Sequence, residues 1–413
     1  MPSPKKIIVG RKNDLIEINK FMKGKSKKNF IYNLYGPGGI GKTELRNLLE
    51  NDLQESNSNY ALINGDTPNF DFSSVLRIIR AKVFYSNFNS KKLNIFDAKI
   101  KFYFIVSNLV GKFGINYFTN EKKEISNIVN INDSTLINNL NEVFENFYSY
   151  DNYMNTSISS ITELLSNALN EFCDELNIQP IIIFDAYEKL SSLDFWLRTE
   201  MVKNFPEKSK FIFFGRDSLP DISYGWNDYG NNTVTKYLDE IDEPFVHSFF
   251  EKNGLHDNEQ YKNIFLFTGG YPLCMQLTVS LVRKMGGWQE LEGFSRLNDR
   301  YEVSKYLLER LLEQERTKPV KDFIENGVVF PFFNIEVISK FLNLSMTEAE
   351  KIYNTLSTLS FIEKSSAGLK FHDKVQEILI ERLRFMNIFE EKREKALQCL
   401  NLIRNENTKN DLY

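Results

Sequence analysis

The sequence has little cysteine and little histidine, with three residues of each type in a chain of 413. The cysteines Cys173, Cys274 and Cys399 are odd in number, widely spaced and without a histidine at the spacing of metal ligands. A disulfide framework and a zinc site are therefore not indicated. Each cysteine is expected to be a small buried apolar residue.

Long apolar segments are also missing. The opening MPSPKKIIVGRKND has no apolar signal core. The most apolar stretch, FYFIVSNLVGKF at residues 102–113, is too short to span a membrane and is interrupted by Lys112. We therefore expect a cytoplasmic protein that has no membrane partner.

A surplus of positive charge is absent as well, because the formal net charge of the chain is −4. A negative net charge does not favour binding to nucleic acid by the molecule as a whole. Residues 1–30 are locally rich in lysine and arginine, which indicates a solvated basic edge, or else a patch for nucleic acid or another anionic partner. Hydrophobic residues at 42% and charged residues at 26% predict a folded protein, and the length predicts roughly two to four domains.

What the sequence does contain is a glycine-rich segment between a strand pattern and a helix pattern. GPGGIGKT at residues 36–43 follows aromatic and β-branched residues at 30–35 and precedes leucines at helical spacing in 43–55. Glycines let successive backbone N–H groups turn towards phosphate oxygens, and a helix N-terminus adds partial positive charge. A glycine-rich turn with an incidental lysine is the alternative, but both flanks favour a phosphate-binding loop.

The spacing G-x-x-x-x-G-K-T assigns roles within this loop. Lys42 would neutralise the β- and γ-phosphates of a nucleotide, and the hydroxyl of Thr43 would bind Mg²⁺. The nucleotide contacts predicted from this segment are Gly36, Pro37, Gly38, Gly39, Ile40, Gly41, Lys42, Thr43 and Glu44.

Apolar runs at 60–66, 180–190 and 210–217, with a weaker one at 233–238, alternate with helical patterns. This alternation predicts an α/β fold, a P-loop parallel sheet covered by helices on both faces.

The interval between the second and third strands, at about 67–179, is too long for a loop and predicts a helical insertion. Its aromatic residues are expected to form a core of their own, with a partner surface as the alternative. The P-loop nucleotide-binding domain that contains this insertion is assigned to residues 1–243.

Strand patterns stop after this domain. Residues 244–318 predict a small all-α lid, because glycines end its helical patterns. Residues 319–388 show two helices, a hairpin around a Ser-Ser-Ala-Gly turn and a further helix, which is a winged-helix outline. Residues 389–413 predict a charged helix that runs into a polar tail.

Three polar residues after the buried strands are candidates for catalysis. Asp185 ends an apolar strand, where a carboxylate would help to hold Mg²⁺. Hydrolysis also needs a group that positions water, and Glu188 is the nearest acid, although it would alternatively pair with Lys189 or Arg198 on the surface.

Arg216 follows the next strand, where it would sense the γ-phosphate and stabilise charge in the transition state. An ion pair with Asp217 or Asp221 is the equally weighted alternative.

The order of six motifs resembles that of the STAND ATPases, signal-transduction relatives of AAA+ proteins that include the NB-ARC switches. The motifs are IIVGRKNDLIEI, GPGGIGKT, IIIFDAYEKL, FIFFGRDSL, TGGYPLCMQL and LKFHDKVQEIL, and they span about residues 7–385. The resemblance implies an ATPase core, a lid and a winged helix that enclose the nucleotide. It places Val9, Gly10 and Arg11 near the adenine, Pro272 against the base or ribose, and His372 at the ADP phosphates.

Two features depart from that family. Many related ATPases have Glu or Asp directly after the magnesium-binding Asp, where this chain has Ala186, and Glu188 is the nearest replacement. Effector and repeat-sensor domains are not recognisable, so either a partner effector or sensor is a separate chain, or this chain is a shortened form or a minimal switch. Without the resemblance, His372 would be interpreted as a structural histidine.

These observations predict an ATP/ADP-dependent conformational switch that binds Mg-ATP, hydrolyses it slowly and controls assembly or an effector in a defence or signalling system. A homo-oligomer is one expected assembly. The alternatives are a winged-helix nucleic-acid-binding ATPase similar to origin-recognition ATPases, and a scaffold that uses ATP structurally.

Overall fold

The structure is a computed structural model. It describes residues 10–24, 30–67, 70–85, 88–113, 147–256, 264–285, 300–313, 315, 317–359, 361–365 and 367–410. The chain divides into two compact units, which we call the sheet unit and the C-terminal unit. The sheet unit comprises Asp14–Gly36 and Lys42–Tyr237, and the C-terminal unit comprises Met1–Asn13, Pro37–Gly41 and Leu238–Tyr413. The four-domain division predicted from the sequence stays a prediction.

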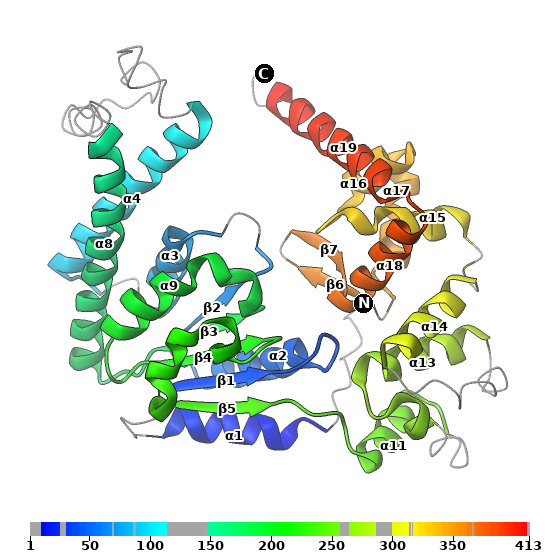
Figure 1. Cartoon of the computed structure of the whole chain (residues 1–413), viewed down its shortest axis with the longest axis horizontal. Coiled ribbons are helices and arrows are strands. Elements are labelled where there is room, and N and C mark those ends of the chain that lie inside the picture. Colours follow the sequence, from blue (N-terminus) through cyan, green and yellow to red (C-terminus); the bar gives the residue numbers. More distant parts are fainter. Residues whose placement is uncertain are drawn as a thin grey trace. The chain divides into compact units, whose positions relative to one another are not determined.

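The sheet unit is built on a five-stranded sheet in which every neighbouring pair is parallel. The strands have the order β2-β3-β4-β1-β5 (Figure 1). Their bounds are Ile31–Tyr35 for β1, Tyr60–Asn64 for β2, Ile181–Asp185 for β3, Lys210–Gly215 for β4 and Thr233–Tyr237 for β5. All five predicted strands are confirmed, including the weak one.

Burial explains the largely apolar composition of the three central strands. β3 and β4 are buried along their whole length and β1 nearly so, whereas the edge strands β2 and β5 are only partly buried. Phe184 and Phe213 stack across the β3–β4 pair with ring centroids 4.8 Å apart. Asn33 is the polar exception in β1, and its side-chain oxygen accepts the N–H of Leu219 at 3.0 Å.

Helices cover the sheet and form the predicted insertion. α1 is Lys12–Lys23, α2 is Lys42–Glu55, α3 is Phe72–Val83, α4 is Lys91–Phe113 and α8 is Phe147–Leu176. In the sequence, α3, α4 and α8 come between β2 and β3, and α4 packs against α8. The ring of Phe72 contacts those of Tyr103 and Trp196, so these described aromatic residues belong to the core of the unit. Part of the predicted insertion, residues 114–146, lies outside the described residues.

Short helical elements connect the last three strands. They are η1 (Tyr187–Leu193), α9 (Asp194–Trp196), η2 (Leu197–Val202), α10 (Leu219–Ile222) and η3 (Tyr224–Asn232). One carboxylate oxygen of the buried Asp194 accepts the hydroxyl of Tyr187 and the indole N–H of Trp226, each at 2.7 Å. This buried acid therefore fixes η1 against η3 at the side of the sheet.

The C-terminal unit contains the predicted helical lid and winged helix. Its helices are α11 (Glu243–Lys252), α13 (Pro272–Met285), α14 (Arg300–Glu313), α15 (Lys318–Asn326), η5 (Gly327–Val329), α16 (Ile335–Leu342), α17 (Met346–Leu356), α18 (Asp373–Phe385) and α19 (Phe389–Asn410). The strands β6 (Ile362–Ser365) and β7 (Gly368–Phe371) form an antiparallel hairpin, and Phe333 bridges to Leu369.

The order α15, bridge, α16, α17, β6 and β7 is a complete winged helix, and Ser345 and Glu348 form a capping box that starts α17. The predicted fold class is confirmed. Among the described ranges, no helix has the length and apolar character needed to cross a membrane.

Candidate functional site

The candidate site lies at the carboxyl edge of the sheet. β1, β4 and β3 are parallel neighbours, so the segments that follow them leave the same edge. Tyr35 pairs with Gly215 in register, and the N–H of Gly36 donates to the carbonyl of Gly215 at 3.3 Å. The sheet therefore brings the starts of the glycine-rich loop and of the segment at Arg216 together.

The glycine-rich loop connects β1 to α2 and needs its glycines. Gly39 and Gly41 have φ angles of +90° and +98°, a region that favours glycine. A Cβ at Gly39 would also lie 3.0 Å from both the Tyr271 hydroxyl and the Leu273 Cβ. This backbone geometry agrees with a phosphate-binding loop.

Carbonyl groups of three successive loop residues are held by partners outside the loop, all within the C-terminal unit. The hydroxyl of Tyr271 donates to Gly38, the N–H of Leu273 donates to Gly39 at 3.3 Å, and Arg11 Nη2 donates to Ile40 at 2.7 Å. Tyr271 and Leu273 therefore contact the loop, although neither was predicted from the sequence as a site residue.

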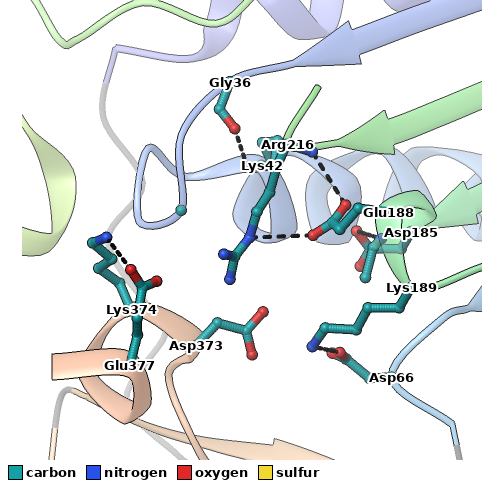
Figure 2. Close-up of polar contacts among 12 residues, drawn as sticks. Gly36, Lys42, Asp66, Asp185, Glu188, Lys189, Arg216, Asp373, Lys374 and Glu377 are labelled. Atoms are coloured by element: carbon teal, nitrogen blue, oxygen red, sulfur yellow. Dashed lines mark hydrogen bonds and ion pairs between the residues drawn. The ribbon is translucent and has the colours of Figure 1, made fainter. Parts of the chain in front are cut away.

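Lys42 is the first residue of α2, so it lies at a helix N-terminus. Its ammonium group donates to the carbonyl oxygen of Gly36 at 2.6 Å (Figure 2). Thr43 and Glu44 follow in the first turn. The lysine is thus held beside the loop in which the sequence predicts phosphate.

Asp185 ends β3 and is 6% exposed. Its Oδ1 accepts the N–H of Ala186 at 3.0 Å, and its Oδ2 accepts Arg46 Nε at 3.1 Å. Arg46 also pairs with Glu50, with 3.1 Å between Nη1 and Oε2. Arg46 has no signal in the sequence, because the P-loop pattern ends at Thr43 and nothing local links position 46 to a strand far along the chain.

Glu188 and Arg216 are brought together. Arg216 Nε lies 3.3 Å from Glu188 Oε1, and the backbone N–H of Arg216 donates to Oε2 at 3.1 Å (Figure 2). Lys189, one alternative partner of Glu188, pairs with Asp66, and Arg198, the other, lies 3.9 Å from Asp194. The two predicted catalytic residues therefore contact each other.

Ala186 explains how an acid two positions later reaches the end of β4. Its φ and ψ of +52° and +47° are left-handed, which costs a residue with a Cβ roughly 1 kcal/mol. This turn starts η1, whose second residue, Glu188, meets Arg216. Strain at a non-glycine residue beside a candidate site is a recognised mark of functional segments.

The residues that the resemblance places near adenine lie in the C-terminal unit. Gly10 has φ of +79°, and a Cβ there would lie 2.8 Å from Ile241 Cγ2. Arg11 is 5% exposed and, besides Ile40, its Nη2 donates to the carbonyl of Asp239 at 2.7 Å. Pro272 begins α13, and its Cγ would lie 3.8 Å from a Cβ at Gly41. Val9 lies outside the described residues, and adenine contact by the others stays a prediction.

His372 is the N-cap of α18. Its Nδ1 accepts the N–H of Lys374 at 3.3 Å, and its own N–H donates to the carbonyl of Phe361 at 2.9 Å. These contacts give it a structural role at the end of the hairpin, and its reach to nucleotide phosphates stays a prediction.

No protein-family model and no curated protein matches the sequence. Cdc6p from Pyrobaculum aerophilum is a similar solved structure, with 11% identity, coverage of 94% of this chain and 97% of that chain, and a TM-score of 0.37. The Orc1 protein of Aeropyrum pernix, solved in complex with DNA, has 12% identity, coverage of 92% and 95%, and a TM-score of 0.33. At these TM-scores neither likeness bears on activity or partner, and similarity to STAND ATPases stays a prediction.

Proposed function

We propose that the chain is a P-loop ATPase that binds Mg-ATP at the carboxyl edge of its parallel sheet. The observation that carries this proposal is the arrangement of GPGGIGKT between β1 and α2, with Asp185 ending β3 on the same edge. Loop amides and Lys42 would bind the phosphates. Adenine rather than guanine is proposed, because the only guanine-type motif in the sequence, TKND at 408–411, follows no strand of the sheet.

The residues present fit a magnesium ion. A threonine hydroxyl at the start of α2 and a carboxylate at the end of β3 are oxygen ligands of the kind that Mg²⁺ uses with nucleotide phosphates. Thr43 and Asp185 would hold the ion, which would supply charge neutralisation of the phosphates.

Hydrolysis is assigned to Glu188 and Arg216. A carboxylate at this edge would orient the attacking water, and a guanidinium would stabilise charge that develops on the phosphates. In the structure these groups pair with each other, so the water-positioning carboxylate must leave Arg216 before it acts. We therefore propose slow turnover.

The experiment that tests the ATPase is ligand stabilisation combined with phosphate release. Mg-ATP at a hundredfold excess over its Kd should stabilise the protein by about 2.7 kcal/mol, seen as a raised Tm, and should release phosphate slowly. Asp185→Asn should reduce both effects. Lys208→Ala is the matched control, because Lys208 pairs with Asp174 beside the amino end of β4 and should change neither. A Tm that does not respond to Mg-ATP would refute the proposal.

We also propose that the nucleotide acts as a conformational switch. The support is the loop itself, since Gly36 and Lys42 belong to the sheet unit and Pro37–Gly41 to the C-terminal unit. Tyr271, Leu273 and Arg11 bind the carbonyl groups of the intervening residues, so phosphate binding that moves these carbonyls would change contacts within the C-terminal unit.

Mass photometry with ADP and with a non-hydrolysable ATP analogue tests the switch and the proposed homo-oligomer. A nucleotide-dependent change in mass supports assembly by this chain. An unchanged monomer mass, together with an unchanged protease digestion pattern, would refute the switch.

A second candidate is a nucleic-acid-binding ATPase, and the complete winged helix is the observation that favours it. α17, the helix that would enter a groove in such a fold, carries Glu348, Glu350 and Lys351, which is not a basic surface. Salt-dependent retention of duplex DNA at submicromolar protein would support this candidate.

A further inference from the structure

Arg46 lies between two carboxylates at the candidate magnesium site. It contacts Asp185 at the end of β3 and Glu50 one turn later on its own helix, each at 3.1 Å. The side chains of Asp185, Arg46 and Glu50 are 9%, 13% and 26% exposed, so the three groups are largely removed from water. Both contacts lie within the sheet unit.

The two oxygens of Asp185 have different partners, which decides what Arg46 does there. Oδ1 accepts the N–H of the next residue, Ala186, and is fixed by the backbone turn. Oδ2 accepts Arg46 Nε. Arg46 therefore neutralises Oδ2, the oxygen of Asp185 that would face a magnesium ion or its water shell.

Glu50 is held in a position where it can accept the arginine. Its Oε1 accepts the hydroxyl of Tyr60 at 3.1 Å, so the carboxylate is held from β2 as well as from α2. A tyrosine hydroxyl is protonated at neutral pH and can donate, and burial raises the pKa of Tyr60 further above its usual value of 10.0. A second acceptor is thus in place when Arg46 releases Asp185.

We propose that Arg46 is a positioning residue that competes with Mg²⁺ for Asp185 and moves fully onto Glu50 when the metal–nucleotide complex binds. Arg46 thereby sets the Mg²⁺ concentration that is required for nucleotide binding. This inference rests on the proposed nucleotide site, and it assigns Arg46 a role that the P-loop pattern does not contain.

The test is a titration of Mg²⁺ at a fixed concentration of fluorescent ADP, with binding read by anisotropy. Arg46→Met should lower the half-saturating Mg²⁺ concentration about threefold to tenfold, because Asp185 loses its competing cation. Glu50→Gln should raise the same value about twofold to fivefold, because Arg46 loses its alternative acceptor. Arg46→Lys, which keeps the charge, should lie between wild type and the methionine variant.

Arg80→Met is the matched control, since Arg80 makes a similar ion pair with Asp97 in α4, on the insertion. It should leave the Mg²⁺ requirement unchanged. Glu50→Gln and Arg46→Lys carry the test if the methionine variant does not fold.

The outcomes separate this inference from the proposed function. Wild-type protein that binds no nucleotide at any Mg²⁺ concentration overturns both. Wild-type binding with an Arg46→Met value within twofold of wild type, or with a higher value, overturns the role of Arg46 alone. Opposite shifts for the Arg46→Met and Glu50→Gln variants support it.

Discussion

Replacing Glu188 by glutamine and Arg216 by methionine, singly and together, measures the contact between the two proposed catalytic side chains. Methionine removes the 3.3 Å contact to Nε and keeps the backbone N–H of residue 216, which donates to Glu188 at 3.1 Å. Glutamine removes the charge and keeps an oxygen that accepts this N–H. The double variant therefore isolates the ion pair.

The expected coupling follows from burial. The Glu188 and Arg216 side chains are 19% and 35% exposed, which is between a surface pair and a buried one. Surface pairs contribute up to about 1 kcal/mol, and single hydrogen bonds to charged groups contribute about 1.5–3 kcal/mol. Because solvent screens the arginine in part, we expect a coupling of about 1 kcal/mol in urea unfolding.

Phosphate release separates stability from catalysis. Glu188→Gln should lower kcat at least tenfold if the carboxylate positions water, whereas its cost in stability should be about 1 kcal/mol. Additive unfolding free energies for the two substitutions would refute the pairing, and an unchanged kcat in the glutamine variant would refute the role of Glu188.

Three further substitutions test other parts of the structure. Ala186→Gly should leave the free energy of unfolding unchanged or raise it by up to about 1 kcal/mol, because glycine relieves the strain of the left-handed backbone. Ala186→Val should lower it by about 1–2 kcal/mol. Urea unfolding measures both, and equal values for the two variants would contradict the strain. Asp194→Ala should cost about 2–4 kcal/mol, since buried hydroxyl and indole donors lose their acceptor; a loss below 1 kcal/mol in the same assay would contradict this. Tyr271→Phe should weaken nucleotide binding about threefold to tenfold with little change in Tm, because it removes the hydrogen bond to the carbonyl of Gly38 in the loop. An unchanged affinity in a fluorescence titration would show that this hydrogen bond does not position the loop.

The sequence predicts the sheet and the loop because their signals are local. Short apolar, aromatic or β-branched segments mark β1 to β5, most weakly at β5, and the spacing from Gly36 to Thr43 is set by phosphate geometry within one turn. The helix, helix, hairpin order of the winged helix is equally visible in helical periodicity and turn residues.

Pairings between distant segments are not visible in the same way. Arg46 meets Asp185 across 139 residues, and Glu188 meets the backbone of Arg216 across 28 residues, because parallel strands bring their ends to one edge. The left-handed turn at Ala186 has no local signal either, since alanine is not a residue that favours such a turn. The sequence therefore predicts the acids and the arginine as candidates, but only the fold shows which of them are in contact.

Direct binding of fluorescent ATP with Mg²⁺ tests whether the loop around Lys42 binds an adenine nucleotide. We expect saturable binding to the wild-type protein, at least tenfold weaker binding to Lys42→Ala because the phosphates lose their lysine, and unchanged binding to Lys208→Ala. Absence of binding to the wild-type protein, or equal affinity in the Lys42→Ala variant, would contradict it.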